Sequence, residues 1–123
     1  GAGDILVLDD DDVTRLVLQQ VLTRLGYTAQ VAHDDVSLKE LLGNTTVQFA
    51  LAIVDVMIGG RPCNACIRMI RERFAGIPLV LTSGLDEASA MRSLGDCGHK
   101  GFMQKPFEVR ALADVIRAAL RTS

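Results

Sequence analysis

The chain reads Ile5-Leu6-Val7-Leu8-Asp9-Asp10-Asp11-Asp12 near its N-terminus, so that four apolar residues are followed at once by four aspartates. A short continuous apolar run of this kind predicts a strand buried on both faces, which is typical of parallel sheets. The abrupt change to acidic residues marks the end of that strand, and Asp11 or Asp12 is expected to cap the helix that follows. The opening stretch therefore predicts a parallel sheet whose first strand ends in carboxylates.

The rest of the chain alternates between short apolar runs and segments whose apolar residues recur at helical spacing. Further strands are predicted over residues 28–32, 49–54, 77–81 and 101–104, and helices over residues 13–25, 36–42, 65–74, 85–94 and 109–120. Repeated alternation of strand and helix favours an α/β domain with a parallel sheet and helices on both of its faces.

Size and composition restrict the classes of function. The chain has 123 residues, room for one domain, and its formal charge of −2 comes without any basic run. Nucleic-acid binding depends on clustered Lys and Arg, so no direct nucleic-acid contact is expected. The longest apolar runs are far below the ~18 residues of a membrane span, and the N-terminus does not resemble a signal peptide. A cytoplasmic domain without membrane contact is predicted over residues 4–123, and residues 1–3 are set aside as a linker or cloning remnant.

Conspicuous polar residues follow the predicted strands at their C-terminal ends. In an open α/β sheet this edge is where ligands bind, and the ends of separate strands meet there. Four strands are therefore expected to bring the following side chains to one crevice: Asp9, Asp10, Asp55, Thr82 and Lys105.

This set of side chains has the chemistry of phosphoryl transfer. Three carboxylates cannot all stay charged at low cost without a cation, and hard oxygen ligands with open positions suit Mg²⁺. Lys105 supplies a positive charge and Thr82 a hydroxyl for phosphate oxygens. Phosphoryl transfer is catalysed mainly by positioning and charge neutralisation, and one carboxylate must act as the nucleophile. Asp55 stands alone at the end of its strand and is the expected nucleophile.

The same residues carry a family resemblance over essentially the whole chain. The motifs, in order, are Val7-Leu8-Asp9-Asp10, Asp55, Leu81-Thr82-Ser83 and Lys105-Pro106-Phe107. Together they resemble the receiver domain of bacterial response regulators in two-component signalling. The resemblance implies a flavodoxin-like (βα)5 three-layer sandwich, in which the five-stranded parallel sheet has the order 2-1-3-4-5.

The resemblance also implies how a metal ion and a phosphoryl group would be bound. Asp10 would bind Mg²⁺ directly and Asp9 mainly through water. Asp55 would be both a metal ligand and the phosphoacceptor, and Met57 would offer its backbone carbonyl to the metal.

The remaining implied roles concern the phosphoryl oxygens and the response to phosphorylation. Thr82 and Lys105 would hold those oxygens, helped by the backbone amide of Ser83. Phe102 falls at the aromatic switch position of the family, with a plain core role as the alternative. Phosphorylation would remodel the surface formed by the fourth helix, the fifth strand and the fifth helix, which is also a candidate surface for homodimer formation.

The implied phosphodonor is a phosphohistidine on a histidine kinase or on a histidine phosphotransfer domain. The segments Val13-Thr14-Arg15-Leu16-Val17-Leu18 and Gly101-Phe102-Met103-Gln104-Lys105-Pro106-Phe107 are similar to receivers attached to hybrid sensor histidine kinases. A module of such a kinase is therefore the preferred context, and a stand-alone single-domain regulator is the alternative. Whether the parent chain is an enzyme stays open.

Three departures from the common family pattern leave every site side chain in place: Met57-Ile58 replaces Met-Pro, Asp35 replaces a Gly, and His99 replaces a small residue.

Two rival functions belong to other classes. A flavodoxin-like FMN carrier would need a Ser/Thr/Gly phosphate loop where this chain has four aspartates. A degenerate interaction module would not need the complete Asp/Thr/Lys set.

The three cysteines form an odd number, which suits reduced thiols better than disulfides. Cys63 and Cys66 form a C-x-x-C pair at a predicted helix start, where a lowered thiol pKa and redox sensitivity are conceivable. Cys97 and His99 would complete four zinc ligands, but the two pairs are predicted at opposite edges of the sheet, which argues against zinc.

Overall fold

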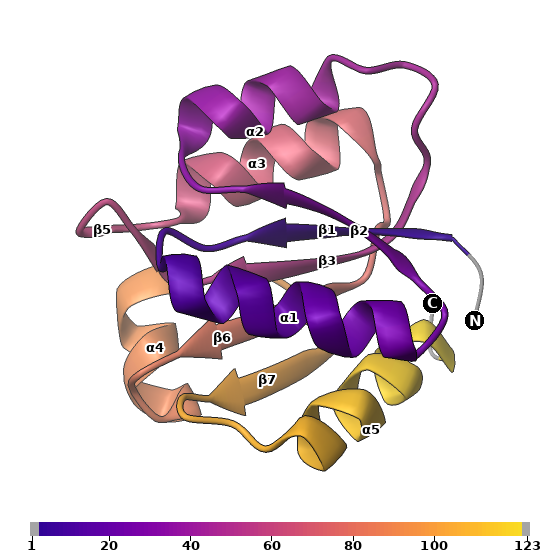
Figure 1. The fold of residues 1–123 in the computed structure, drawn as a ribbon. Helices are drawn as coiled ribbons and strands as arrows, with labels where there is room; N and C mark the ends of the chain where they lie inside the picture. Colours follow the sequence, from indigo (N-terminus) through magenta and orange to yellow (C-terminus); the bar gives the residue numbers. More distant parts are fainter. Residues whose placement is uncertain (1–2, 122–123) are drawn as a thin grey trace.

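The computed structural model describes residues 3–121, and the central feature is a five-stranded parallel sheet (Figure 1). Its strands are β1 (Asp4–Leu8), β2 (Thr28–Ala32), β3 (Phe49–Asp55), β6 (Leu79–Ser83) and β7 (Gly101–Gln104). They lie in the order β2-β1-β3-β6-β7, which is the predicted order 2-1-3-4-5 once the five strands are counted along the chain. The predicted flavodoxin-like fold is confirmed.

Helices cover both faces of the sheet (Figure 1). Within residues 3–121 the helices are α1 (Asp12–Arg24), α2 (Asp35–Leu42), α3 (Asn64–Arg73), α4 (Glu87–Leu94) and α5 (Val109–Arg121). One apolar cluster joins the sheet to α1 and α5, and a second cluster joins it to α2, α3 and α4. These described helices are not suited to crossing a membrane, because none is both long and apolar enough.

Residues 5–8 of β1 are apolar without alternation because both faces of this strand are buried. Ile5 and Val7 pack into the cluster with α1 and α5, whereas Leu6 and Leu8 pack into the cluster on the opposite face. All four side chains are fully buried. A strand in the interior of a doubly covered sheet has two apolar faces, so consecutive apolar residues are the expected pattern.

Aspartate side chains cap the N-termini of two helices, α1 and α4. The Asp11 side chain accepts a hydrogen bond from the Thr14 amide and so caps α1, as predicted for one of Asp11 and Asp12. Asp86 caps α4 in the same way through the Ser89 amide. The predicted start of the fourth helix at Leu85 was therefore two residues early, and Leu85 lies exposed before the cap.

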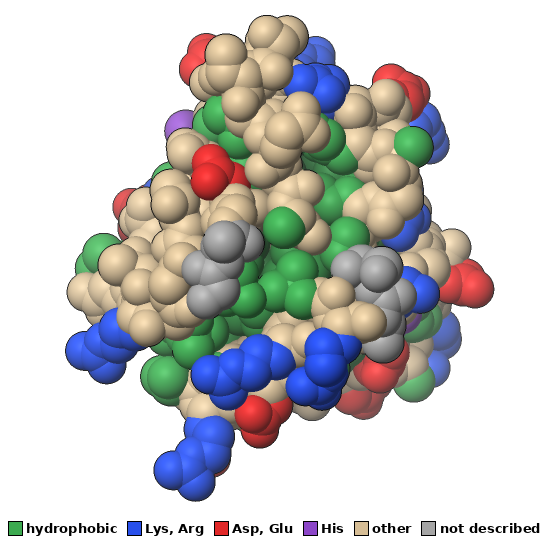
Figure 2. Space-filling view, turned by 90° about the vertical axis from the view of Figure 1, so that its right-hand side faces the viewer, with side chains coloured by type: hydrophobic (Ala, Val, Ile, Leu, Met, Phe, Trp, Pro, Cys, Tyr) green, Lys and Arg blue, Asp and Glu red, His purple; other side chains and the backbone are tan. Residues whose placement is uncertain are grey.

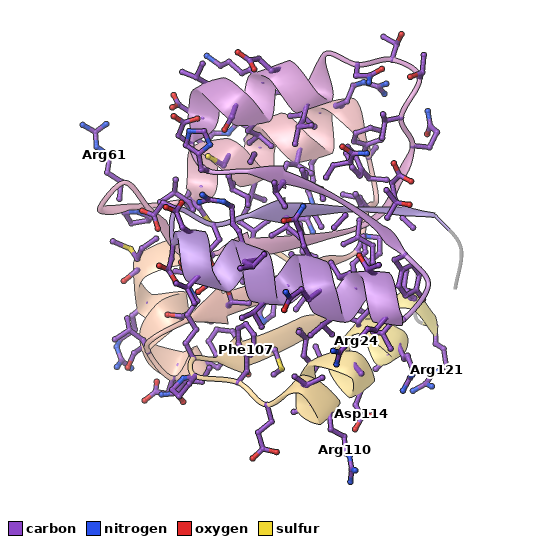
Figure 3. The ribbon with its side chains drawn as sticks, viewed as in Figure 1. Arg24, Arg61, Phe107, Arg110, Asp114 and Arg121 are labelled. Carbon is purple, nitrogen blue, oxygen red and sulfur yellow. The ribbon has the colours of Figure 1, made fainter. Side chains whose placement is uncertain are left out.

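A small hairpin follows β3, the third strand of the sheet along the chain. It consists of β4 (Met57–Ile58) and β5 (Arg61–Pro62), which pair antiparallel. Gly59 and Gly60 join them with φ angles of 61° and 76°, in the left-handed region that a tight two-residue turn of this kind requires. The Arg61 side chain at the tip points away from the body of the domain (Figure 3).

The two edges of the sheet differ in character. Figure 2 faces the edge where the strands begin, with apolar side chains at its centre and Lys or Arg side chains along its lower rim. Arg24 and Arg121 are the basic residues in the last turns of α1 and α5. The four aspartates from Asp9 to Asp12 follow β1 at the opposite edge.

Replacing Gly101 with Ala is expected to destabilise the fold. A Cβ atom at this position would lie 2.6 Å from Val115 Cγ1 and 3.3 Å from Val80 Cγ2, so α5 would have to move away from β7. Overpacking of this kind costs about 1–3 kcal/mol in the free energy of unfolding, which urea denaturation would measure. Gly84→Ala is the matched control, because a Cβ there meets nothing within 4 Å. Equal stability of both variants would contradict the packing argument.

Candidate functional site

The ends of β1 and β3 bring three carboxylates together, as the sequence predicted. One carboxylate oxygen each from Asp9, Asp10 and Asp55 lies within 4.8 Å of the other two. Asp9 is fully buried and Asp55 is 8% exposed, whereas Asp10 is open to solvent. The oxygens thus form a cluster with one accessible side.

Lys105 supplies the countercharge inside this cluster. It follows β7 directly, and its Nζ donates to Asp9 Oδ2 at 2.8 Å and to Asp55 Oδ2 at 2.9 Å. Burial of the ammonium group works to lower the pKa of Lys105, but its hydrogen bonds to the two carboxylates outweigh burial and raise this pKa. Lys105 is therefore a fixed cation shared by two carboxylates that come from separate strands.

Asp55 is held at both carboxylate oxygens. Oδ1 accepts a hydrogen bond from the Met57 amide at 3.1 Å, while Oδ2 faces Lys105. Burial raises the pKa of Asp55, and although the hydrogen bonds from Lys105 and Met57 oppose this, the net direction is upward. The Asp55 carboxylate is thus held in a fixed orientation, but burial makes its negative charge unfavourable. Binding of a further cation beside it would therefore be favourable.

The Asp9–Asp10 corner is held by contacts that the sequence did not reveal. Asp9 Oδ1 accepts from the Asp11 amide at 2.9 Å, and the Asp9 carbonyl accepts from Arg15 Nη1 at 2.7 Å. Asp10 Oδ2 accepts from the Gly59 amide at 2.9 Å, which ties the hairpin to the site. No sequence pattern joins Asp10 to Gly59, whereas Arg15, one turn into α1, could have been suspected from its position beside four aspartates.

Thr82 and Ser83 end β6 next to the cluster, since Thr82 is the register partner of Asp55. Thr82 is 1% exposed, and its Oγ1 is the one fully buried side-chain N or O atom without a hydrogen-bond partner in the part of the chain that the structure describes. Ser83 Oγ instead accepts a hydrogen bond from the Leu85 amide at 3.0 Å. A buried hydroxyl without a partner costs free energy, so Thr82 is available to an incoming acceptor.

Thr82→Val is expected to raise the free energy of unfolding by about 1 kcal/mol in the absence of metal and phosphodonor. Valine keeps the shape of the side chain and removes the hydroxyl that no group satisfies. Thermal or urea unfolding would measure the change. The neighbouring Ser83→Ala should instead lower stability, because its hydroxyl has a partner. Destabilisation of both variants by the same amount would show that the Thr82 hydroxyl is satisfied.

The oxygen-rich donor set fits a hard divalent cation such as Mg²⁺, which prefers carboxylate and carbonyl oxygens. The Met57 carbonyl is a reasonable further donor, because Pro62 lies opposite Met57 in the hairpin and has no N–H with which to occupy it. The ligand roles of Asp9, Asp10, Asp55 and Met57 stay predictions, as do the phosphoryl-binding roles of Thr82, Ser83 and Lys105.

Phe102 lies on β7, one strand away from Thr82. Its ring is half-buried and packs against the apolar cluster that contains Ala90 and Leu94 of α4. A side chain between the sheet and α4 is suitably located for the predicted switch. The switch role itself stays a prediction.

The idea of an acidic thiol at the C-x-x-C pair was wrong. Burial raises the pKa of Cys63 to about 12, with further contributions from Cys66 and Cys97. Burial also raises the pKa of Cys66, and the nearby Asp35 and Asp34 add to this. Within residues 3–121, the side chains of Asp9, Asp10 and Asp55 form the one group with metal-ligand spacing, and this group includes no cysteine.

Comparison with known proteins assigns the family. The profile of the response regulator receiver domain matches residues 5–117. The chain therefore belongs to the response regulator receiver domains of two-component systems.

The chain covers very different fractions of its individual relatives. Protein PetR of Rhodobacter capsulatus is 31% identical over 117 residues, which are 95% of this chain and 48% of PetR. Sensor kinase CckA of Brucella abortus is 25% identical over 120 residues, which are 98% of this chain and 13% of the kinase. The chain spans about half the length of the first curated relatives that it matches.

Among solved structures, a CheY-like response regulator receiver domain protein from Methanospirillum hungatei has a TM-score of 0.84 at 20% identity, covering 99% of this chain and 96% of that chain. This likeness concerns the fold.

Proposed function

We propose that the domain is a phosphorylation switch in which Asp55 accepts a phosphoryl group from a phosphohistidine. The observation that carries the proposal is the position of Lys105, whose Nζ touches both buried carboxylates at the edge where β1, β3 and β7 end. The partnerless hydroxyl of Thr82, beside Asp55 in the sheet, adds a second group suited to phosphoryl oxygens. A carboxylate, a cation and a hydroxyl in this arrangement suit phosphoryl transfer better than redox or acyl chemistry.

The proposed reaction forms one bond and breaks one. A carboxylate oxygen of Asp55 attacks phosphorus, the bond from phosphorus to the donor imidazole breaks, and the electron pair leaves with that imidazole. Lys105 can then exchange its contact with Asp55 Oδ2 for a phosphoryl oxygen while keeping Asp9. Bound Mg²⁺, held by Asp9, Asp10, Asp55 and the Met57 carbonyl, would supply neutralisation of the phosphoryl charge.

The donor domain is a histidine kinase or a histidine phosphotransfer domain. Support comes from an open hollow of about 400 Å³ beside Lys105, formed by α1 and the segment after β7. Phe107 is one of the residues that line this hollow (Figure 3). On α1, the side chains of Val13 and Leu16 are 68% and 55% exposed. An exposed apolar surface next to an acceptor suits a helical partner that must bring its imidazole to Asp55.

The output surface is α4, β7 and α5, where Phe102 would follow Thr82 on phosphorylation. This surface also serves as the proposed homodimer contact. The preferred context is a hybrid histidine kinase in the cytoplasm, to which the resemblance to sensor kinase CckA lends support. A stand-alone regulator is the second candidate, and the four aspartates after β1 speak against an FMN carrier.

Incubation with a small acyl phosphate tests the proposal. Wild-type protein should gain one alkali-labile phosphoryl group by intact mass when Mg²⁺ is present, and little without it. Asp10→Asn should be labelled far more slowly, because it lacks one oxygen ligand at the open side of the site. Asp114→Asn, on the exposed face of α5, is the matched control and should behave as wild type. A wild-type protein that stays unlabelled would overturn the proposal, and a normal Mg²⁺-dependent rate in Asp10→Asn would remove Asp10 from the metal site.

A further inference from the structure

The three thiols have different electrostatic surroundings. Cys63 and Cys66 are buried, and neighbouring thiols or carboxylates raise the pKa of each further. Cys97 is half-buried in the segment between α4 and β7, beside two groups that can carry positive charge. Reactive cysteines sit in partly exposed, electropositive surroundings, whereas buried structural cysteines are inert.

The first neighbour of Cys97 is an imidazole fixed by a carboxylate. Cys97 Sγ lies 3.9 Å from Nδ1 of His99, and His99 Nε2 lies 2.8 Å from Oε2 of Glu87. The His99 side chain is 13% exposed, so its ring is held between these groups. In the tautomer whose proton lies on Nε2, Glu87 accepts that proton and the Nδ1 lone pair faces the thiol. A nucleophile, a base and a group that orients the base therefore follow one another in space.

The second neighbour is Arg71 of α3. Its guanidinium donates to the backbone carbonyl of Cys97, and its Nη2 lies 3.8 Å from the position that a Cβ would take at Gly98. Burial raises the pKa of the Cys97 thiol, while the charge of Arg71 acts to lower it. The resting group is thus a thiol, and its reactivity depends on a base that removes the proton during attack.

We propose that Cys97 is a covalent modification site for soft carbon electrophiles of the α,β-unsaturated carbonyl class, with His99 as its general base and Glu87 orienting His99. The sulfur adds to the β-carbon of the electrophile, and the electron pair of the carbon–carbon double bond moves to form an enolate. His99 takes the thiol proton at Nδ1 and returns it to the α-carbon. No group leaves, and no oxidant or reductant is needed.

This site is separate from the phosphorylation site and does not depend on it. Glu87 lies in the first turn of α4, so the three side chains connect that helix to the segment that enters β7. The inference stands on the thiol, the imidazole and the carboxylate alone, and it would survive a failure of Asp55 to accept phosphate.

The test uses acrylamide as the electrophile on the folded wild-type protein, with each cysteine followed by peptide mass spectrometry. Cys97 should be alkylated at least about tenfold faster than Cys63 or Cys66. His99→Gln should slow the reaction of Cys97 by about tenfold or more, less than the ~10²–10⁴-fold contribution of a well-placed base because the Sγ to Nδ1 contact is long. Glu87→Gln should also slow it, because the imidazole loses its charged partner.

The matched control is His33→Gln. His33 is exposed and pairs with Asp34, so its loss should leave the alkylation rate of Cys97 unchanged. Circular dichroism checks the fold, and if His99→Gln unfolds, Glu87→Gln decides. The inference is overturned if Cys97 reacts no faster than Cys66 in the wild type, or if folded His99→Gln or Glu87→Gln keeps the wild-type rate at Cys97.

Discussion

Asp55→Asn protein should take up no phosphoryl group from an acyl phosphate under conditions in which the wild type is labelled. The amide keeps the size of the side chain, and its oxygen can still accept from the Met57 amide. It cannot act as the nucleophile, because amide oxygen carries no full negative charge. The loss should therefore be complete while the fold is retained, since Asn also removes the cost of burying the Asp55 charge.

Intact mass, followed by treatment with alkali or hydroxylamine, measures the label. Asp9→Asn is the informative companion variant, because Asp9 shares Lys105 with Asp55 but is not the proposed acceptor. It should be labelled slowly, and the label should still map to Asp55. Equal labelling of Asp55→Asn and wild type would place the acceptor elsewhere.

Lys105→Ala should destabilise the metal-free protein by about 3 kcal/mol, because it leaves Asp9 and Asp55 buried without their cation. The pH dependence has a definite sign. The folded-state pKa of Asp55 is already raised, and loss of Lys105 raises it further. A carboxyl group with a raised folded-state pKa stabilises the fold below its unfolded-state pKa, and this contribution is lost as the pH rises through the folded-state pKa. The loss of stability in Lys105→Ala relative to the wild type should therefore be large at about pH 7 and small at about pH 4.

Urea denaturation at both pH values, with and without Mg²⁺, measures this effect. The proposed Mg²⁺ ligands come together only in the folded state, so Mg²⁺ should stabilise the wild type by about 2.7 kcal/mol at a hundredfold excess over its dissociation constant. The gain should be larger in Lys105→Ala, where the metal would replace the missing charge. Lys100→Ala, an exposed lysine before β7, is the control and should change stability little. A defect that is independent of pH would mean that Lys105 acts through packing and not through charge.

Much of the fold followed from simple patterns in the chain. Ile5 to Leu8 and Phe49 to Val54 are apolar runs without alternation, and the structure buries nearly all of them between two helical layers. The aspartates that end these runs meet because C-terminal ends of parallel strands share one edge. The strand order came from the family resemblance, since periodicity does not specify which strands are neighbours.

What the sequence did not reveal depends on contacts between distant segments. Strands of two residues, such as Met57–Ile58, are too short to show a period, although Gly59-Gly60 is a recognisable signal for a tight hairpin turn. A lowered thiol pKa at the start of α3 was one possible interpretation of the C-x-x-C spacing. It does not hold because Cys63 is buried, and the spacing does not disclose burial. The pairing of His99 with Glu87 joins a loop to a helix, and nothing local to either residue indicates it.

The hydrogen bond from the Gly59 amide to Asp10 provides a spectroscopic reporter for this domain. The chain has no Trp and one Tyr, so intrinsic fluorescence offers little contrast. The Gly59 amide proton, by contrast, senses the Asp10 carboxylate directly, and any change in that oxygen's ligands must shift its NMR resonance. Gly60, the next residue in the turn, provides a built-in reference. Two backbone signals of one hairpin could thus follow ligand binding at the acidic edge without any added label on the side chains.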